Sequence, residues 1–296
     1  MGLPNFLIIG TAKGGTTSLY SYLSQHPKIY MSPNKEPGFF ALEGESLDFQ
    51  GPDEAFSRTS VTNIEDYQKL FDGVTNEVAI GEASPFYLYF PKASERIKHY
   101  IPEAKLIVSL RNPVDRAYAS YMHNVRMGYE TDSFEASFNK ESERIQDNWI
   151  YLWHYKQCGL YYQQLKRYFE TFDREQIKVY LFEDLAQSTQ STVQDIFTFL
   201  SIDDTFVPDL SIVNASGIPR SKLIHNLVDR GNPVREALKS VVPDGLRKDI
   251  ANQIRKINLA PKPPIEPKTK QVIADFYRDD VLKLQDLIDR DLSGWL

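Results

Sequence analysis

The sequence predicts an α/β fold with a mostly parallel central sheet flanked by helices. Short apolar runs alternate with segments of helical periodicity, and each run is continuously apolar. Continuous runs are typical of parallel strands, which are buried on both faces, whereas half-exposed strands alternate apolar and polar residues. Strands that alternate with helices over this length indicate right-handed crossover connections.

Four apolar runs are expected to form the strands, at residues 6–10, 77–81, 105–110 and 177–182. Helical patterns lie at residues 17–25, 92–100, 113–126, 160–172, 192–200 and 268–290. The proline-rich stretch 259–267 resembles a short connector into the last helix rather than a domain boundary. Residues 1–296 are therefore expected to form a single domain.

The composition excludes several classes of protein. A chain of 296 residues with 42% hydrophobic and 25% charged residues is typical of a globular protein and excludes wholesale disorder. The net charge of −6 argues against broad nucleic-acid binding, although it leaves room for a small basic pocket. The single cysteine, Cys158, excludes internal disulfides and Cys-rich zinc sites and fits a reducing compartment.

The chain also lacks the pattern of a membrane or secretory segment. The apolar run at residues 6–9 is far shorter than the ~20 residues that a membrane helix needs, and no basic segment precedes it. We therefore expect a soluble, cytoplasmic protein with no membrane span.

The strongest local signal is the segment 10–18, GTAKGGTTS, between the first strand and the first helix. Glycines such as Gly14 and Gly15 let backbone N–H groups approach an anion, and the helix N-terminus adds partial positive charge. Hydroxyls that can donate to phosphate oxygens follow at Thr16, Thr17 and Ser18. A capped strand-to-helix turn needs only one or two such residues, so the addition of Lys13 favours phosphate binding.

This loop differs from the Walker A motif G-x-x-x-x-G-K-[ST]. Thr16 stands where the motif has lysine, and the lysine lies inside the loop at Lys13. A lysine there is expected beside a single 5′-phosphate and the group attached to it. Leu110 is followed by Arg111 instead of a magnesium-binding aspartate. Both differences disfavour the alternative function, a P-loop nucleotide kinase or phosphotransferase that uses ATP and magnesium.

Several motifs together resemble sulfotransferases that use 3′-phosphoadenosine-5′-phosphosulfate (PAPS) and release adenosine 3′,5′-bisphosphate (PAP). Segment 10–19 resembles their 5′-phosphosulfate loop, and segment 110–121 (LRNPVDRAYASY) resembles their 3′-phosphate motif. Further matches are 35–40 (KEPGFF), 81–85 (GEASP), 159–161 (GLY), 182–185 (FEDL) and 290–295 (RDLSGW). The pattern is most similar to heparan-sulfate-type and bacterial carbohydrate or polyketide sulfotransferases.

The resemblance implies a P-loop-like sulfotransferase fold and transfer of a sulfuryl group to a hydroxyl or amine without a required metal. Lys13 is expected to stabilise charge on the oxygen that joins sulfur to the leaving phosphate. The matching heparan-type motif places the general base at Glu36, for which pairing with Lys35 is the simpler alternative. His123 is the rival base. The presence of Lys13 and Glu36 disfavours a third possibility, a non-catalytic nucleotide-binding module.

The resemblance assigns Arg111 to the 3′-phosphate, where a guanidinium can form two parallel hydrogen bonds. The family usually has serine eight residues later, but this chain has Ala119. Ser120 is the next hydroxyl and is the expected helix contact to the nucleotide in its place, although it points about 100° away on the helix. The late segment 214–222 resembles a basic loop that closes over the nucleotide, so Arg220 and Lys222 are also expected to contact it.

The acceptor site is less defined by the sequence. Glu82 and Ser84 follow a strand end, where α/β sheets bind ligands, and with Phe39 they are expected to bind the acceptor. Ala83 stands where heparan-type enzymes usually have lysine, which disfavours a polysulfated polymer. The aromatic-rich span 149–162 fits an acceptor cleft or a buried amphipathic helix equally well. A small molecule, a carbohydrate and an acyl chain all remain possible acceptors.

Overall fold

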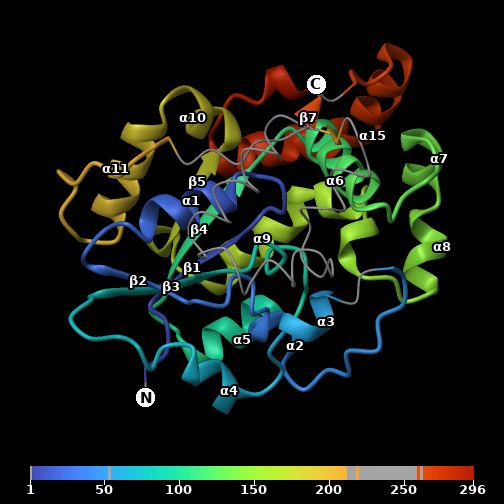
Figure 1. The fold of residues 1–296 in the computed structure, drawn as a ribbon. Coiled ribbons are helices and arrows are strands. Elements are labelled where there is room, and N and C mark those ends of the chain that lie inside the picture. Colours follow the sequence, from blue (N-terminus) through green and yellow to red (C-terminus); the bar gives the residue numbers. More distant parts are fainter. Residues whose placement is uncertain (1, 53–54, 212–217, 220–258, 261–262) are drawn as a thin grey trace, which may run out of the picture.

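The computed structural model describes residues 2–52, 55–211, 218–219, 259–260 and 263–296. A five-stranded parallel sheet in the order β2-β3-β1-β4-β5 forms its centre (Figure 1). Its strands are β1 (Phe6–Gly10), β2 (Ile29–Met31), β3 (Ala79–Ala83), β4 (Lys105–Leu110) and β5 (Ile177–Leu181). The predicted mostly parallel sheet is therefore confirmed.

Four of the five strands agree with the sequence-based expectation. The bounds of β1 and β4 are those predicted, β5 ends one residue earlier, and β3 begins two residues later. The sequence does not predict β2, because a strand of three residues is too short to show periodicity. The missing strand lies at the edge of the sheet, next to β3.

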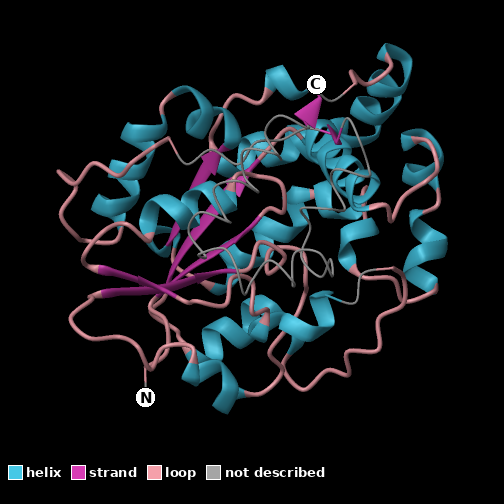
Figure 2. Ribbon diagram, viewed as in Figure 1, coloured by secondary structure: helices cyan, strands magenta, loops and turns pink. Residues whose placement is uncertain are grey.

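Helices cover both faces of the sheet, as Figures 1 and 2 show. Successive strand residues point to opposite faces, so Phe6 and Ile8 of β1 pack in one core while Leu7 and Ile9 pack in the other. The first core includes α1 (Thr16–Leu23) and α11 (Thr189–Phe199). The second includes α5 (Ala93–Tyr100), α6 (Pro113–Met127), α9 (Tyr161–Thr171) and α15 (Pro267–Ile288). Burial on both faces explains why the strands are apolar throughout.

These six helices lie where the sequence predicts helices, with ends that differ by at most three residues. Shorter helices also occur, at α2 (Phe39–Leu42), α3 (Ala55–Thr59), α4 (Ile64–Lys69), α7 (Phe134–Asn139), α8 (Glu141–Gln146) and α10 (Phe182–Gln187). Short 3-10 turns are η1 (Tyr151–Trp153), η2 (Gln157–Gly159), η3 (Arg174–Gln176) and η5 (Ser293–Trp295). Helices of four to six residues contain fewer than two turns, which is too little for a periodic signal.

The start of α6 fixes the position of the second candidate phosphate motif. Asn112 caps this helix, since its side-chain oxygen accepts hydrogen bonds from the N–H groups of Val114 (2.9 Å) and Asp115 (3.3 Å). Pro113 occupies the first turn, where its missing N–H costs no helical hydrogen bond. The helix therefore begins immediately after Arg111, which stays at the end of β4.

Two short strands outside the central sheet, β6 (Ile218–Pro219) and β7 (Leu259–Ala260), pair in antiparallel orientation. The predicted connector 259–267 thus begins with β7 and ends where α15 starts. α15 has 22 residues. In the part of the chain that the structure describes, no helix combines enough length and apolar character to span a bilayer.

Candidate active site

The candidate motifs gather at one edge of the sheet. Because β1, β3 and β4 are neighbouring parallel strands, their carboxyl ends lie at the same edge. The segments that follow them contain the candidate nucleotide-binding and acceptor-binding residues. Parallel α/β sheets bind ligands at this edge. The topology therefore supports the site location that the sequence predicts.

Close packing shapes the turn after β1, residues 11–15, which we call the phosphate loop. The Gly14 N–H donates to the Thr11 carbonyl (2.9 Å), and the Ser109 hydroxyl of β4 donates to the Gly14 carbonyl. A Cβ atom on Gly14 would lie 2.5 Å from the Ser109 carbonyl oxygen, so a side chain there would displace the loop. Gly15 has a φ of 91°, in the left-handed region that glycine adopts without strain.

The phosphate loop leads directly into α1, whose N-terminus is suited to an anion. Gly15 is the N-cap residue and provides no side-chain cap, and the first turn contains no acidic residue. The partial positive charge of the helix end therefore has no carboxylate to offset it locally. Among the three predicted hydroxyls, Thr17 is exposed, Ser18 is half-buried and Thr16 is buried.

The structure brings Lys13 and Arg111 together. Nη1 of Arg111 donates to the Lys13 carbonyl (3.2 Å), and the guanidinium lies 4.5 Å from the centre of the Phe182 ring. The Tyr161 hydroxyl donates to the Arg111 carbonyl (2.9 Å), which fixes the backbone at the end of β4. Burial lowers the pKa of Arg111 below its ordinary value. A partly desolvated guanidinium held on an aromatic ring is a strong partner for a phosphate.

Glu36 lies in the turn before α2, and we call residues 35–40, which comprise this turn and the first two residues of α2, the Glu36 loop. Its carboxylate pairs with Nζ of Lys35 at 2.5 Å, so the simpler alternative for this residue does exist. The pair leaves the carboxylate accessible, because 32% of the Glu36 side chain is exposed. Among the described residues, five non-glycine residues have a positive φ, and Lys13 (69°) and Glu36 (66°) are two of them. Such strained backbones are concentrated at functional sites.

The three residues expected to bind the acceptor are buried. Phe39, Glu82 and Ser84 have exposed fractions of 0%, and the Phe39 ring stacks on Tyr67 with 4.6 Å between ring centres. None of these three side chains reaches the surface in the structure, and their expected role in acceptor binding stays a prediction. Burial raises the pKa of Glu82 to about 7, and the nearby charge of Glu36 acts in the same direction.

The remaining candidates differ in how far the structure describes them. His123 lies in α6, where Nη2 of Arg126 is 3.0 Å from its Nδ1 atom. Ser120 is 3% exposed, and its neighbour Ala119 is also buried. Arg220 and Lys222 lie outside the described residues.

The aromatic span 149–162 does not form a single helix. Two 3-10 turns precede α9 in this span. Tyr151, Trp153, Tyr155 and Tyr161 are at most 5% exposed and belong to the larger core. The span therefore serves mainly to pack the core beneath α6 and α9.

Sequence reasoning missed contributions from Ser109, Phe182 and Tyr87. Ser109 ties β4 to the phosphate loop, and its signal was a hydroxyl within the otherwise apolar run KLIVSL. Phe182 supports the Arg111 guanidinium, and the segment 182–185 is one of the matched motifs. Tyr87 contacts the Glu36 loop, but nothing distinguishes it from its aromatic neighbours in the sequence.

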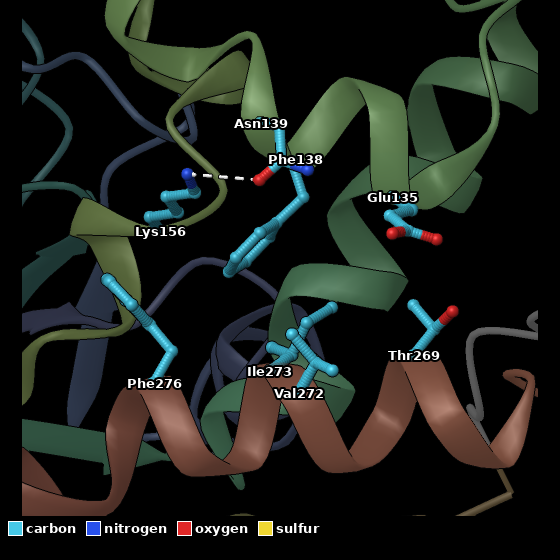
Figure 3. Close-up of a pocket in the computed structure, with 8 residues that line it drawn as sticks. All are labelled: Glu135, Phe138, Asn139, Lys156, Thr269, Val272, Ile273 and Phe276. Carbon is cyan, nitrogen blue, oxygen red and sulfur yellow. Dashed lines mark hydrogen bonds between the residues drawn. The ribbon is translucent and has the colours of Figure 1, made fainter.

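A separate pocket of about 130 Å³ lies between α7 and α15 (Figure 3). Its lining consists of Glu135, Phe138, Asn139, Lys156, Thr269, Val272, Ile273 and Phe276. Nζ of Lys156 lies 5.0 Å from the Phe138 ring centre and 3.4 Å from Oδ1 of Asn139. None of the candidate site residues lines this pocket.

Comparison with known proteins identifies the family. Residues 3–230 match the family described as sulfotransferase domain. A sulfotransferase structure from Alicyclobacillus acidocaldarius is 38% identical, with a TM-score of 0.80 over 100% of this chain and 99% of that one. The chain therefore belongs to the sulfotransferase family, and the predicted family and fold are confirmed.

More distant relatives share the family or the fold. The sulfotransferase domain from the curacin biosynthetic pathway is 15% identical, with a TM-score of 0.51 over 93% of this chain and 98% of that one. Carbohydrate sulfotransferase 15 of Rattus norvegicus is 24% identical over 99% of this chain and 54% of its own length. Membrane-associated sulfotransferase kil1 of Dictyostelium discoideum is 36% identical over 42% of this chain and 24% of its own length. The chain thus spans from about a quarter to about half of these curated relatives.

Proposed function

We propose that this chain transfers a sulfuryl group from PAPS to a hydroxyl or amine of a small-molecule, carbohydrate or acyl-chain acceptor. The observation that carries the proposal is the hydrogen bond from Arg111 to the Lys13 carbonyl. This bond joins the two candidate phosphate-binding segments at the sheet edge where the carboxyl ends of β1 and β4 lie. A mouse sulfotransferase solved in complex with PAP has a similar fold, with 16% identity and a TM-score of 0.50 over 94% of this chain and 84% of that one. This similarity of fold supports the proposal that this chain uses the same nucleotide.

In this proposal the nucleotide is held through its two ends. Backbone N–H groups of the phosphate loop and the α1 N-terminus bind the 5′-phosphosulfate, together with the hydroxyls of Thr17 and Ser18. Arg111 binds the 3′-phosphate through its guanidinium, which Phe182 supports from one side. Binding at both ends fixes the sulfur atom relative to the end of β1, and such positioning supplies much of the catalysis in group transfer.

The transfer itself requires a base and a stabilised leaving group. The acceptor oxygen or nitrogen forms a bond to sulfur while the bond from sulfur to the bridging oxygen breaks, and that electron pair stays on the 5′-phosphate of PAP. The Lys13 ammonium stabilises the negative charge that develops on this oxygen. Glu36 accepts the proton that the acceptor loses.

A binding experiment distinguishes this function from the alternative of a nucleotide kinase. We expect PAP to raise the melting temperature of the protein, whereas ATP with magnesium should raise it much less. Stabilisation by ATP with magnesium but not by PAP would contradict the proposal. Transfer of ³⁵S from labelled PAPS to a panel of simple alcohols, amines, sugars and hydroxyacyl chains then identifies the acceptor class.

A further inference from the structure

A buried cluster of polar side chains lies directly behind the Glu36 loop. It consists of one carboxylate and three hydroxyl groups, contributed by Glu82, Tyr67, Ser84 and Tyr87, and we call it the Glu82 cluster. All four residues have exposed fractions of 0%. Glu82 and Ser84 lie at or just beyond the end of β3, next to β1. The cluster therefore connects the end of the sheet with the loop that contains the proposed base.

All three hydroxyls of the cluster lie beside the same carboxylate, and two of them donate hydrogen bonds to it. The Ser84 hydroxyl donates to Oε2 of Glu82 (2.9 Å), and the Tyr67 hydroxyl donates to Oε1 (3.3 Å). The Tyr87 hydroxyl lies close to this carboxyl group. An ionised carboxylate can only accept hydrogen bonds, and a hydroxyl has only one proton to donate. With Glu82 ionised, the Ser84 and Tyr67 hydroxyl oxygens are consequently left as acceptors.

Two hydroxyl oxygens of the cluster accept hydrogen bonds from the Glu36 loop. The Gly38 N–H donates to Oγ of Ser84 (3.1 Å), and the Phe40 N–H donates to the Tyr87 hydroxyl oxygen (3.4 Å). These amides follow Glu36 by two and four residues. Gly38 itself has a φ of 74° and precedes α2 as its N-cap. The Ser84 hydroxyl, which Glu82 orients, and the Tyr87 hydroxyl beside the same carboxyl group thus hold the left-handed backbone of the loop.

We propose that Glu82 is a positioning residue that holds the proposed base Glu36 in place through the hydroxyls of Ser84 and Tyr87. This inference rests on the proposed function, because it takes Glu36 as the base. Glu82 has no exposed surface in the structure, so in this inference it acts through its neighbours. Burial of a carboxylate is costly and is not needed to fill space, because a neutral side chain of the same shape would pack without that cost.

The test removes one hydroxyl of the relay at a time. We expect Ser84→Ala and Tyr87→Phe each to lower kcat about five- to tenfold, the effect of about one lost hydrogen bond, with an unchanged KM for PAPS. Tyr277→Phe is the matched control, because it removes a buried phenol hydroxyl whose single proton is shared between the carbonyls of Tyr155 and Lys156 instead. This control should retain the wild-type kcat.

A double-mutant cycle separates positioning from general support of the fold. In a Glu36→Gln background, Ser84→Ala and Tyr87→Phe should cause no further loss of kcat, because no base remains to be positioned. Hydrogen exchange at the amides of Gly38 and Phe40 gives a readout that needs no acceptor. Exchange at these amides should accelerate in Ser84→Ala and Tyr87→Phe and should not change in Tyr277→Phe.

The possible outcomes distinguish the two hypotheses. If Glu36→Gln keeps the wild-type kcat, Glu36 is not the base, and the proposed mechanism fails together with this inference. If Glu36→Gln lowers kcat but the hydroxyl variants lower it by the same factor in both backgrounds, the base stands and the positioning role is refuted. Unchanged exchange at Gly38 and Phe40 refutes it as well. Each of these substitutions removes a single oxygen atom, so either variant provides the test if the other does not fold.

Discussion

Substitution of Arg111 by alanine should weaken PAP binding through the loss of one charged contact. In the structure, the guanidinium is partly buried, lies 4.5 Å from the Phe182 ring centre and reaches the Lys13 carbonyl with one nitrogen. Within the described part of the chain, the bond to Lys13 uses only Nη1, and the fork geometry that a phosphate accepts needs two guanidinium nitrogens. A hydrogen bond to a charged group contributes about 1.5–3 kcal/mol, so Arg111→Ala should raise the Kd for PAP by roughly one to two decades.

Calorimetric titration with two nucleotides measures this effect. PAP and adenosine 5′-phosphate differ only in the 3′-phosphate, so Arg111→Ala should weaken PAP strongly and adenosine 5′-phosphate little. Arg111→Lys is the matched control, because it keeps the charge but loses the planar fork, and its affinity for PAP should be intermediate.

The contact with the Lys13 carbonyl provides the main competing explanation. If Arg111 only braces the phosphate loop, its loss should disturb the binding of both nucleotides, because both have a 5′-phosphate. Equal loss of affinity for PAP and for adenosine 5′-phosphate would therefore refute the assignment of Arg111 to the 3′-phosphate.

Three further predictions concern the remaining ionisable groups. Lys13→Ala should lower kcat far more than it lowers the affinity for PAP, because the charge of Lys13 is needed when the leaving oxygen becomes negative. An unchanged kcat would show that Lys13 is an ordinary loop residue. Glu36→Gln should lower kcat by ~10²–10⁴-fold with near-normal affinity for PAP, and His123→Ala should lower kcat much less. The reverse pattern would show that His123 is the base. The raised pKa of Glu82, about 7 against 4.5, adds stability that is present below pH 4.5 and is lost as the pH rises through 7. The free energy of unfolding relative to Glu82→Gln, from urea unfolding at several pH values, should therefore fall by about 3 kcal/mol across this range, and a constant difference would contradict the shift.

The sequence predicts those parts of the fold that depend on local pattern. β1 and β4 are apolar at nearly every position, and the long helices show a clear period, so their bounds follow from the sequence. β2 and the short helices depend on neighbours that are distant in sequence, and their three to six residues show no periodic signal. The edge strand of the sheet is consequently visible only in the structure.

The candidate site shows the same division. Motif order and residue chemistry indicated Lys13, Arg111 and Glu36 as candidate site residues. In the structure these residues lie in the segments that follow the carboxyl ends of β1, β4 and β2, respectively. The burial of Glu82 could not be predicted, because a carboxylate after a strand end is usually exposed to ligand or solvent. Its burial depends on Tyr67 and Tyr87, which come from α4 and from the turn after β3. Only the packing of these elements shows that Glu82 bonds internally to Tyr67 and Ser84.

The end of β1 connects the two loops of the proposed mechanism. The Ser84 N–H donates to the Ile8 carbonyl (3.1 Å), and the Leu88 N–H donates to the Ile9 carbonyl (2.8 Å), so the turn after β3 is fixed to β1. A Cβ atom on Gly10 would lie 2.7 Å from Leu88, which shows how closely the last residue of β1, just before the phosphate loop, packs on the same turn. Ser84 in turn bonds to the Glu36 loop through Gly38. The phosphate loop and the Glu36 loop are therefore both held at the end of β1. In-line transfer requires a fixed distance between the leaving group and the base, and this shared attachment would maintain it.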